Sequence, residues 1–310
     1  MKTVTIIGGS GARNTLKALV KIKDIRINNI VTMFDSGGST GYLRKKFGIY
    51  ALGDLRDRIL AVSKNENLRE VSSQRIEIDN IEHNVGNLIL FSLIKKYDKN
   101  YIDVAKKIFK TPSNIHFIPV TDDINCPANL VIKTDKGEFF GEESLDKNSD
   151  KILKIKDVKL DKDVDISKSA TDAIIKSDFL IFGPGDVYSS IIPNTLVNGF
   201  SEAISKSNAK KILIVNIMNK KSETNGFKTS DFVKIFEDRG IKIDYIIANE
   251  KNVNIKNMKG KYGSFSGLVK NNLFNERVIR GDFINEVTPY EHDPEKILLI
   301  LRDIIKNTTN

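Results

Sequence analysis

Strand-like apolar runs alternate with helix-length amphipathic segments along most of the chain, and this alternation is the feature that most restricts its fold. Strands are expected at Val4–Ile7, Asn29–Phe34 and Phe179–Phe182, with helices between them, for example over Asn84–Tyr97. Because parallel strands need crossover connections that are usually helical, this order predicts an α/β fold. We expect a Rossmann-like, mostly parallel sheet flanked by helices.

One stretch departs from this rhythm. From about residue 115 to residue 158 the chain has short alternating runs such as Leu130–Lys133 and Glu138–Phe140, separated by a turn at residues 135–137. Such runs are typical of small antiparallel strands. The α/β pattern then resumes and ends in a helix expected at Glu295–Lys306. We therefore predict that residues 1–310 form a single domain with a small antiparallel β insertion at about 115–158.

The composition limits the classes of function. The formal charge is +9, but it comes mostly from scattered lysines and the chain has no tryptophan, so nucleic acid is not the favoured partner. A basic face can instead attract small molecules that carry phosphate. No apolar run reaches the roughly 18 residues of a membrane-spanning helix. With no signal peptide and one cysteine, Cys126, a cytoplasmic protein without a membrane span is expected; assembly into a homo-oligomer is left open.

The first strand runs into the glycine-rich turn Gly8-Gly9-Ser10-Gly11, which a helix follows. Glycines at such a place let the backbone approach a ligand closely, and the N–H groups of the next helix attract phosphate. The turn is not a P-loop, and it fits the dinucleotide fingerprint only in part because Asn14 stands where the third glycine is expected. A tight turn with no ligand is the alternative.

The second strand leads to Asp35, 24 residues after Gly11. An acidic residue there can accept hydrogen bonds from a ribose or hold a metal ion. It is followed by Gly37, Gly38 and Ser39, in a stretch whose alternative interpretation is a flexible surface turn.

Another glycine turn, Gly183-Pro184-Gly185-Asp186, follows the strand at Phe179–Phe182 and precedes the hydroxyl-bearing residues Tyr188 and Ser189. Ligands of open α/β sheets bind at the carboxyl ends of strands. Two glycine turns of this kind therefore predict a shared crevice, although they do not identify the ligand.

Several segments together resemble one family, the CofD-like group of 2-phospho-L-lactate transferases and gluconeogenesis factors. The segments are GGSG at 8–11, DSGGSTGYLR at 35–44, GDLR at 53–56, HNVGNL at 83–88, GPGDVYSSIIPN at 183–194 and NIM at 216–218. Their order and spacing cover positions 1 to about 250 of the chain.

The resemblance implies a Rossmann-like core that binds a nucleotide. One branch of the family transfers a phospholactyl group from a guanylylated donor to a deazaflavin, with a divalent metal. The other, the gluconeogenesis factors, binds UDP-sugars, has no settled enzymatic activity, and influences cell-wall growth and carbon use. The sequences of the segments at 35–44 and 183–194 resemble the second branch more closely.

The chain also departs from the family pattern. An Asp-Asp pair is usual at the end of the second strand, but here it is Asp35-Ser36, which removes a carboxylate that could help to hold a metal. The segment after Asn216 carries Lys220 and Lys221 where the family has Gln-Pro, and this leaves the UDP-sugar assignment open.

We accordingly predict a nucleotide-sugar-binding regulatory protein, with a metal-dependent transferase as the alternative; whether it is an enzyme is open. Asp35 would contact the ribose or hold a metal ion, for which Mg²⁺ is the candidate, and no catalytic residue is assigned. The predicted binding residues are Gly8, Gly9, Ser10, Gly11, Asp35, Gly37, Gly38, Ser39, Asp54, Arg56, Asn84, Asn87, Gly183, Pro184, Gly185, Asp186, Tyr188, Ser189 and Asn216.

Overall fold

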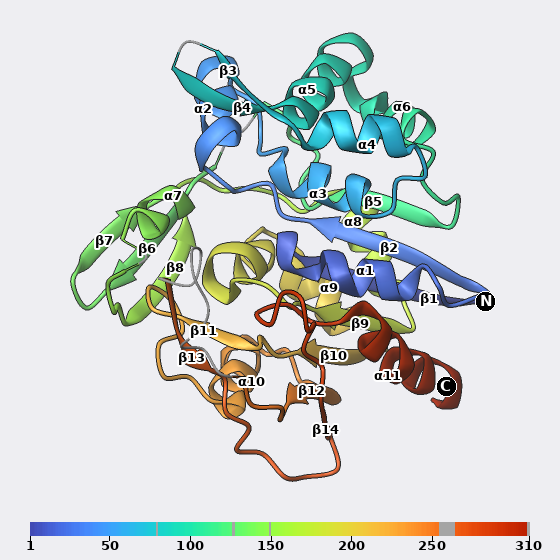
Figure 1. Cartoon of the computed structure of the whole chain (residues 1–310), viewed down its shortest axis with the longest axis vertical. Coiled ribbons are helices and arrows are strands. Elements are labelled where there is room, and N and C mark those ends of the chain that lie inside the picture. The colour runs from blue at the N-terminus through green and yellow to red at the C-terminus, as the bar shows by residue number, and fades with distance from the viewer. Residues whose placement is uncertain (79, 126–127, 149, 254–263, 309–310) are drawn as a thin grey trace.

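A computed structural model of the chain describes residues 1–78, 80–125, 128–148, 150–253 and 264–308. Cys126 lies outside these residues. The main sheet has seven strands in the order β14-β12-β10-β9-β1-β2-β5, and every adjacent pair is parallel (Figure 1). Its strands are β1 (Lys2–Gly8), β2 (Ile25–Val31), β5 (Ile115–Pro119), β9 (Phe179–Phe182), β10 (Lys210–Ile214), β12 (Tyr245–Asn249) and β14 (Val278–Gly281). The predicted Rossmann-like α/β fold is confirmed.

The direction of the strand order reverses between β1 and β9. From β1 the chain moves outward through β2 to β5, and it then returns to the other side of β1 and continues from β9 through β10 and β12 to β14. When the connections from two neighbouring strands run to opposite sides of the sheet, a crevice forms between them above the carboxyl ends of those strands. The turns that follow β1 and β9 therefore border the crevice.

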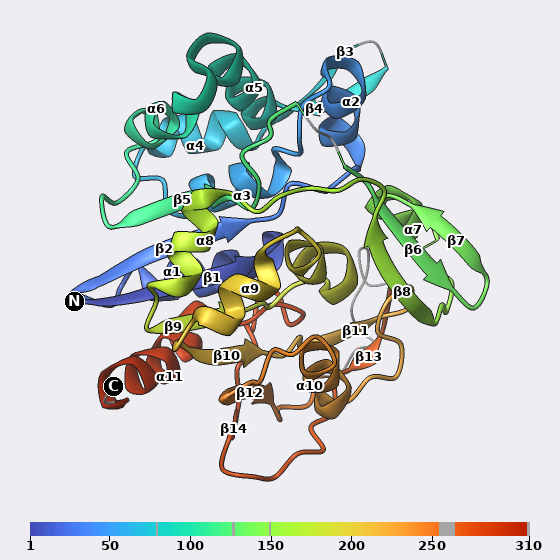
Figure 2. The same ribbon diagram turned by 180° about the vertical axis from the view of Figure 1, so that it is seen from behind.

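Helices cover both faces of the sheet, which explains why strands such as β9 are apolar and buried along their whole length. Figure 1 shows α1 and α11, which pack against each other, in front of the sheet, and Figure 2 shows α8 and α9 on the opposite face. The helices are α1 (Arg13–Leu19), α2 (Gly38–Phe47), α3 (Gly53–Ala61), α4 (Glu66–Ser73), α5 (Val85–Tyr97), α6 (Tyr101–Ile108), α7 (Glu142–Asp146), α8 (Lys168–Ile175), α9 (Phe200–Lys206), α10 (Thr229–Glu237) and α11 (Pro294–Asn307), with short helices η1 (Ser10–Ala12), η2 (Asp98–Asn100), η3 (Val187–Ile191) and η4 (Ile192–Thr195).

A separate three-stranded antiparallel sheet, in the order β7-β6-β8, stands beside the main sheet (Figure 1). Its strands are β6 (Leu130–Thr134), β7 (Gly137–Phe140) and β8 (Ile155–Leu160). The antiparallel strands were expected here, but the expected start near residue 115 is wrong, because Ile115–Pro119 is β5 and pairs in parallel with β2. A short run that contains His116 and ends in proline does not look like a strand of a parallel sheet. Proline is tolerated at Pro119 because β5 is an edge strand.

Several elements have no clear sequence signal. They are α2, α4, the hairpin of β3 (Arg75–Ile78) and β4 (Ile81–Asn84), and the pair β11 (Met218–Lys220) and β13 (Phe265–Leu268). Helix α9 begins at Phe200, directly after Gly199, which adopts a φ of 89°. In the part of the chain that the structure describes, no helix is both long and apolar enough to span a membrane.

Asp293 caps the N-terminal end of α11, and its contribution to the stability of the protein can be measured directly. The Asp293 carboxylate accepts hydrogen bonds from the backbone N–H groups of Glu295 (2.8 Å) and Lys296 (3.1 Å). Asp293→Ala leaves these donors without their partner, so we expect the free energy of unfolding in urea to fall by about 1 kcal/mol. Asp303→Ala, an exposed change further along the same helix, is the control, and an equal loss from it would contradict the capping role.

Candidate ligand-binding site

The two glycine turns at the ends of β1 and β9 are in contact with each other. A Cβ placed on Gly11 would lie 2.6 Å from the Gly185 Cα and 2.8 Å from the Pro184 carbonyl oxygen. A Cβ on Gly9 would similarly lie 2.5 Å from the Ser190 Cβ. Glycine is therefore required in the first turn, after β1, so that the two backbones can approach, which is a structural reason for the motif beyond any contact with a ligand.

Asn216 holds the second turn, after β9, in place. Its side chain accepts a hydrogen bond from the Gly185 N–H (3.0 Å) and donates one to the Gly185 carbonyl (2.8 Å), while the Gly183 N–H donates to the Ile7 carbonyl (3.2 Å). These two glycine N–H groups are thus already bonded within the protein and are not free for the phosphate of a ligand. The structure gives Asn216 the role of bracing the turn.

Two further predicted residues, Tyr188 and Ser189, bind a buried carboxylate. The Tyr188 N–H donates to Glu223 (3.1 Å), and the Ser189 hydroxyl donates to the other Glu223 oxygen (2.8 Å). Burial raises the pKa of Glu223, and the Lys220 ammonium, 3.4 Å away, opposes that rise. Lys220 also forms an ion pair with Asp186 (2.8 Å). Lys220 and Glu223 therefore stabilise the second turn and the residues that follow it, through Asp186, Tyr188 and Ser189.

A polar cavity of about 290 Å³ lies beside the first turn. It is lined by the predicted residues Asp35, Gly37, Gly38, Ser39, Asp54, Arg56, Asn84 and Asn87, together with Thr40, Gly53, Asp57, Arg75, Glu142 and Ser190. The stretch that begins at Gly38 is the first turn of α2 and not a surface turn, and the Gly37 N–H donates to Asp35 (2.8 Å) just before it. The cavity thus receives the N-terminal end of a helix, where the dipole favours an anion.

Hydrogen bonds between α5, α3 and α2 position the polar side chains of this cavity. Asn84 caps α5 by accepting from the Asn87 N–H (3.3 Å). The Asn87 side chain then accepts from Arg56 (3.0 Å) and donates to the Thr40 hydroxyl (3.2 Å). Arg56 is held with its guanidinium at the cavity wall.

A second cavity of about 340 Å³ adjoins the first, and both are lined by Asp57, Glu142 and Ser190. Its wall contains the predicted residues Gly11, Pro184, Gly185, Asp186 and Asn216, and also Arg13, Ile217, Met218, Phe265, Tyr290, Glu291 and His292. The predicted residues Gly8, Gly9, Gly183, Tyr188 and Ser189 line neither cavity, and Ser10 begins η1. We refer to the two cavities together as the crevice.

Sequence analysis missed the contribution of the last part of the chain to the crevice. Tyr290, Glu291 and His292 lie in an irregular segment before α11, and Phe265 lies on β13, 25 residues earlier than Tyr290. The rings of Phe265 and Tyr290 lie 5.8 Å apart. Nothing in the local pattern connects these residues, because the return of α11 to the sheet next to α1 is what brings them to the crevice.

Glu142 was also missed, and it lies where the two cavities join. Burial raises its pKa well above the ordinary range, and the carboxylates of Asp35, Asp54 and Asp186 raise it further, against the effect of Lys220. A raised pKa favours the neutral form of the carboxyl group, which can donate a hydrogen bond. Its Oε1 lies within hydrogen-bond distance of the Ser189 oxygen (3.2 Å), and because the Ser189 hydrogen is directed at Glu223, this contact ties the antiparallel insertion to the second turn when Glu142 donates.

Arg58, a third residue that sequence analysis missed, lies directly behind the first turn. It is fully buried and donates a hydrogen bond to the Gly9 carbonyl, while its Nε and Nη1 have no partner among the described residues. Burial lowers its pKa to about 10, and Asp54 and Asp57 oppose that shift. The guanidinium therefore stays charged at neutral pH and places positive charge next to the turn where phosphate is expected.

The expected Mg²⁺ at Asp35 stays a prediction. Among the described residues, no group of three or more His, Cys, Asp or Glu side chains is arranged to hold a metal ion. Asp35, Asp54 and Glu142 nevertheless line the same cavity. Mg²⁺ is commonly bound through one or two carboxylates together with the phosphates of a ligand, and this cavity fits that arrangement only when a ligand contributes.

The parallel sheet and the crevice at its switch point define a Rossmann-like protein with a ligand site of the kind that such folds use. The sequence profile of 2-phospho-L-lactate transferase CofD matches residues 3–284, and the chain belongs to this family. It is 36% identical to a putative gluconeogenesis factor of Thermotoga maritima, over 81% of this chain and 79% of that one. It is 33% identical to a putative gluconeogenesis factor of Aquifex aeolicus, over 99% and 98%.

The structure agrees with these relationships. A crystal structure of a Bacillus halodurans protein superposes with a TM-score of 0.84 at 28% identity, covering 97% of this chain and 99% of the other. A gluconeogenesis factor of Halalkalibacterium halodurans is 33% identical over 80% of this chain and 78% of that protein. The resemblance noted from the sequence is confirmed at the level of the family.

Gly11→Ala tests the contact between the two turns. The added methyl group has no room against the Gly185 and Pro184 backbones, so we expect a loss of about 1–3 kcal/mol in the free energy of unfolding, measured in urea. Gly37→Ala is the matched control, because Gly37 has a φ of −86° and its Cβ would meet only Asp35 at 3.4 Å. If the two variants were equally stable, the close contact between the two turns would not require glycine at position 11.

His292 predicts a pH dependence of stability. Burial lowers its pKa from 6.5 to about 4, against a hydrogen bond with the Val215 backbone. Above pH 6.5 both folded and unfolded states are neutral at this residue; as the pH falls from 6.5 towards 4, the unfolded chain binds a proton that the folded chain excludes. The neutral His292 side chain therefore contributes to the free energy of unfolding above pH 6.5. This contribution, on the order of 3 kcal/mol in total, is lost as the pH falls from 6.5 towards 4.

Urea unfolding of the wild type and of His292→Leu between pH 4 and pH 7.5 measures this difference. The variant is less stable overall because Val215 loses its hydrogen-bond partner, but its stability should fall less steeply below pH 6.5. Identical slopes for the two proteins would show that His292 is not held in its neutral form.

Proposed function

We propose that the protein binds a nucleotide-sugar of the UDP-sugar class in the crevice and acts as a regulatory protein of the gluconeogenesis-factor type. The observation that carries this proposal is the contact of two glycine turns above β1 and β9, at the switch point of the sheet, next to a polar cavity. Ligands of doubly wound folds bind at this position. The names of the relatives in Thermotoga maritima and Aquifex aeolicus support the same branch of the family.

The charges around the crevice suggest how the ligand lies. Arg56, the N-terminal end of α2 and the turn in front of the buried Arg58 form the part of the crevice most favourable for a diphosphate. The Phe265 and Tyr290 rings and the His292 side chain, in the adjoining cavity, offer flat surfaces for a base. Regulation of carbon metabolism and cell-wall growth by the bound state, in the cytoplasm, is part of this proposal.

A second candidate is a metal-dependent transferase of the 2-phospho-L-lactate type. The observation that favours it is the gathering of Asp35, Asp54, Glu142 and Asp186 around the crevice, where burial and then the repulsion of the other three carboxylates raise the pKa of Glu142. A divalent cation bound with a guanylylated donor would relieve this repulsion. Ser36 stands where the family has a second aspartate, which argues for the regulatory function.

Isothermal titration with UDP-N-acetylglucosamine, UDP-glucose, GDP and GTP, each with and without Mg²⁺, separates the two functions. Tight binding of a UDP-sugar that does not depend on Mg²⁺ supports the regulatory protein. Binding of guanine nucleotides that requires Mg²⁺ would instead support the transferase, and absence of binding by all four would refute the proposal.

Arg56→Gln should weaken UDP-sugar binding by roughly tenfold or more, because charge-assisted hydrogen bonds contribute about 1.5–3 kcal/mol each. Isothermal titration with UDP-N-acetylglucosamine measures the change in Kd. Arg302→Gln removes the same charge from an exposed position on α11 and should leave Kd unchanged. An Arg56 variant that binds as tightly as the wild type would remove this residue from the phosphate site.

A further inference from the structure

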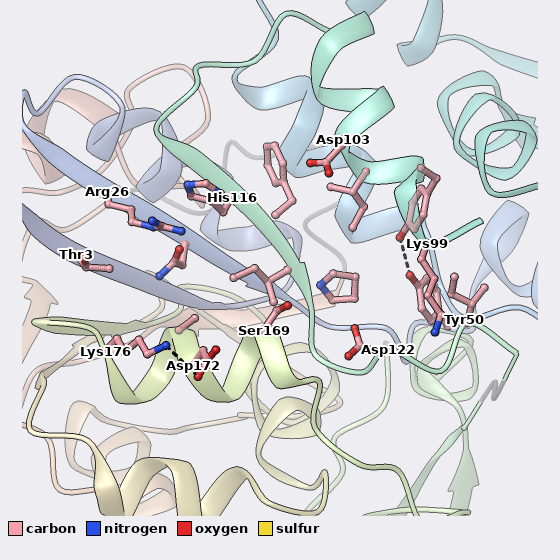
Figure 3. Close-up of a pocket in the computed structure, with 18 residues that line it drawn as sticks. Thr3, Arg26, Tyr50, Lys99, Asp103, His116, Asp122, Ser169, Asp172 and Lys176 are labelled. Atoms are coloured by element: carbon pink, nitrogen blue, oxygen red, sulfur yellow. Dashed lines mark hydrogen bonds and ion pairs between the residues drawn. The ribbon is translucent and has the colours of Figure 1, made fainter. Parts of the chain in front are cut away.

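A third cavity, of about 650 Å³, lies on the β2–β5 side of the sheet, between α6 and α8 (Figure 3). It shares no lining residue with either cavity of the crevice. None of the sequence motifs described above contributes to it, and neither proposed function uses it. We call it the β5 pocket.

The floor of the β5 pocket is unusual for a parallel sheet. The strand register pairs Thr3 with Arg26 and Asn28 with His116, so these polar side chains lie in neighbouring positions on one face of β1, β2 and β5. In a doubly wound sheet this face is normally apolar and covered by helices. Here α8 lies over β1, where Thr5 donates to the Ala173 carbonyl (3.2 Å), and the pocket opens beside it.

Asn28 presents an acceptor to this floor. It is 4% exposed, and its Nδ2 donates to the Thr5 hydroxyl (3.2 Å), which fixes the orientation of the amide. Its Oδ1 has no hydrogen-bond partner among the described residues. An oriented amide oxygen at the base of a cavity is suited to a ligand hydroxyl.

In the part of the chain that the structure describes, Arg26 is the unpaired cation at one end of the pocket, whose lining as a whole has three cations (Arg26, Lys99 and Lys176) and three carboxylates (Asp103, Asp122 and Asp172). The Arg26 guanidinium makes no ion pair or side-chain hydrogen bond with any described residue, and Figure 3 shows it beside His116. Burial, Arg26 and Lys106 lower the pKa of His116, and Asp103 on α6 only partly opposes them. On α8, Lys176 is already paired with Asp172 (3.3 Å).

Hydroxyl and carboxylate groups line the other end of the pocket. The Tyr50 and Tyr101 hydroxyls hydrogen-bond to each other (2.6 Å), and Asp122 lies on the same side (Figure 3). Carboxylate and phenol oxygens of this kind accept hydrogen bonds from sugar hydroxyls. Lys99 also lies at this end (Figure 3), so it is the unpaired Arg26 guanidinium that marks the other end for an anion, while the oxygens here suit the hydroxyls of the same ligand.

We propose that the β5 pocket is a second ligand site, which takes a small phosphorylated sugar or polyol. Its phosphate contacts Arg26 and His116, and its hydroxyls contact Asn28 and Asp122. The volume lies within the range of small-molecule sites, and a polar floor does not suit the apolar core of a protein interface. The site is independent of the crevice, so the protein would respond to two classes of metabolite.

Imidazole NMR provides the test, because the chain has three histidines that report on different places. His116 reports on the β5 pocket, His83 on the first cavity of the crevice through its contact with Ser39 (3.3 Å), and His292 on the second. Titration with inorganic phosphate, and then with glucose 6-phosphate, should shift the His116 signals and raise the His116 pKa, since a bound anion stabilises the imidazolium. Saturation of the crevice with UDP-N-acetylglucosamine should leave this response in place.

Arg26→Gln should weaken the binding of glucose 6-phosphate at His116 by about tenfold or more. Arg26 is exposed, so the unfolding temperature should change little. Lys107→Gln, an equal charge change at an exposed position of α6 outside the pocket, should leave the affinity unchanged. The proposal is overturned if His116 does not respond, if both variants weaken binding equally, or if glucose 6-phosphate binds no tighter than inorganic phosphate.

Discussion

The contact between the backbones of the two glycine turns, after β1 and after β9, is the constraint on which the rest of the site depends. The two backbones can approach only because Gly11 carries no side chain that would meet the Gly185 and Pro184 backbones, and only where β1 and β9 are adjacent. Arg58 holds the first turn through the Gly9 carbonyl, and Asn216 holds the second through both polar groups of Gly185. The crevice is therefore shaped by buried polar groups that no ligand need touch.

Charge is the second organising feature of the crevice. Burial and the neighbouring carboxylates together raise the pKa of Glu142, while Arg58 is kept charged although it is fully buried. The crevice offers a few fixed donors to an anion, and its acidic groups could be satisfied by a cation, a sugar hydroxyl or a base N–H. Which of these it takes distinguishes a sugar-nucleotide sensor from a metal-dependent transferase.

Much of the site could be predicted from local patterns, because glycines and polar residues that directly follow apolar strands gather at the edge of the sheet where ligands bind. Asp35, Arg56, Asn84 and Asn87 do line one cavity, as their places in the chain suggested. Other expectations were changed by contacts between distant segments. The Tyr188 N–H meets the buried Glu223 and is not free for a ligand, and the glycine-rich stretch after Gly37 forms the start of α2.

By itself, the sequence determined the α/β class, most strand positions, the place of the glycine turns and the family, since each depends on local periodicity or on short motifs. Only the tertiary structure decided that Ile115–Pro119 is an edge strand, that Glu142 and the segment around Tyr290 reach the crevice, and that polar residues of β2 and β5 form a pocket of their own. The physical reason is that pairing order and helix coverage depend on contacts between residues far apart in the chain, and no local pattern encodes which face of a strand is left uncovered.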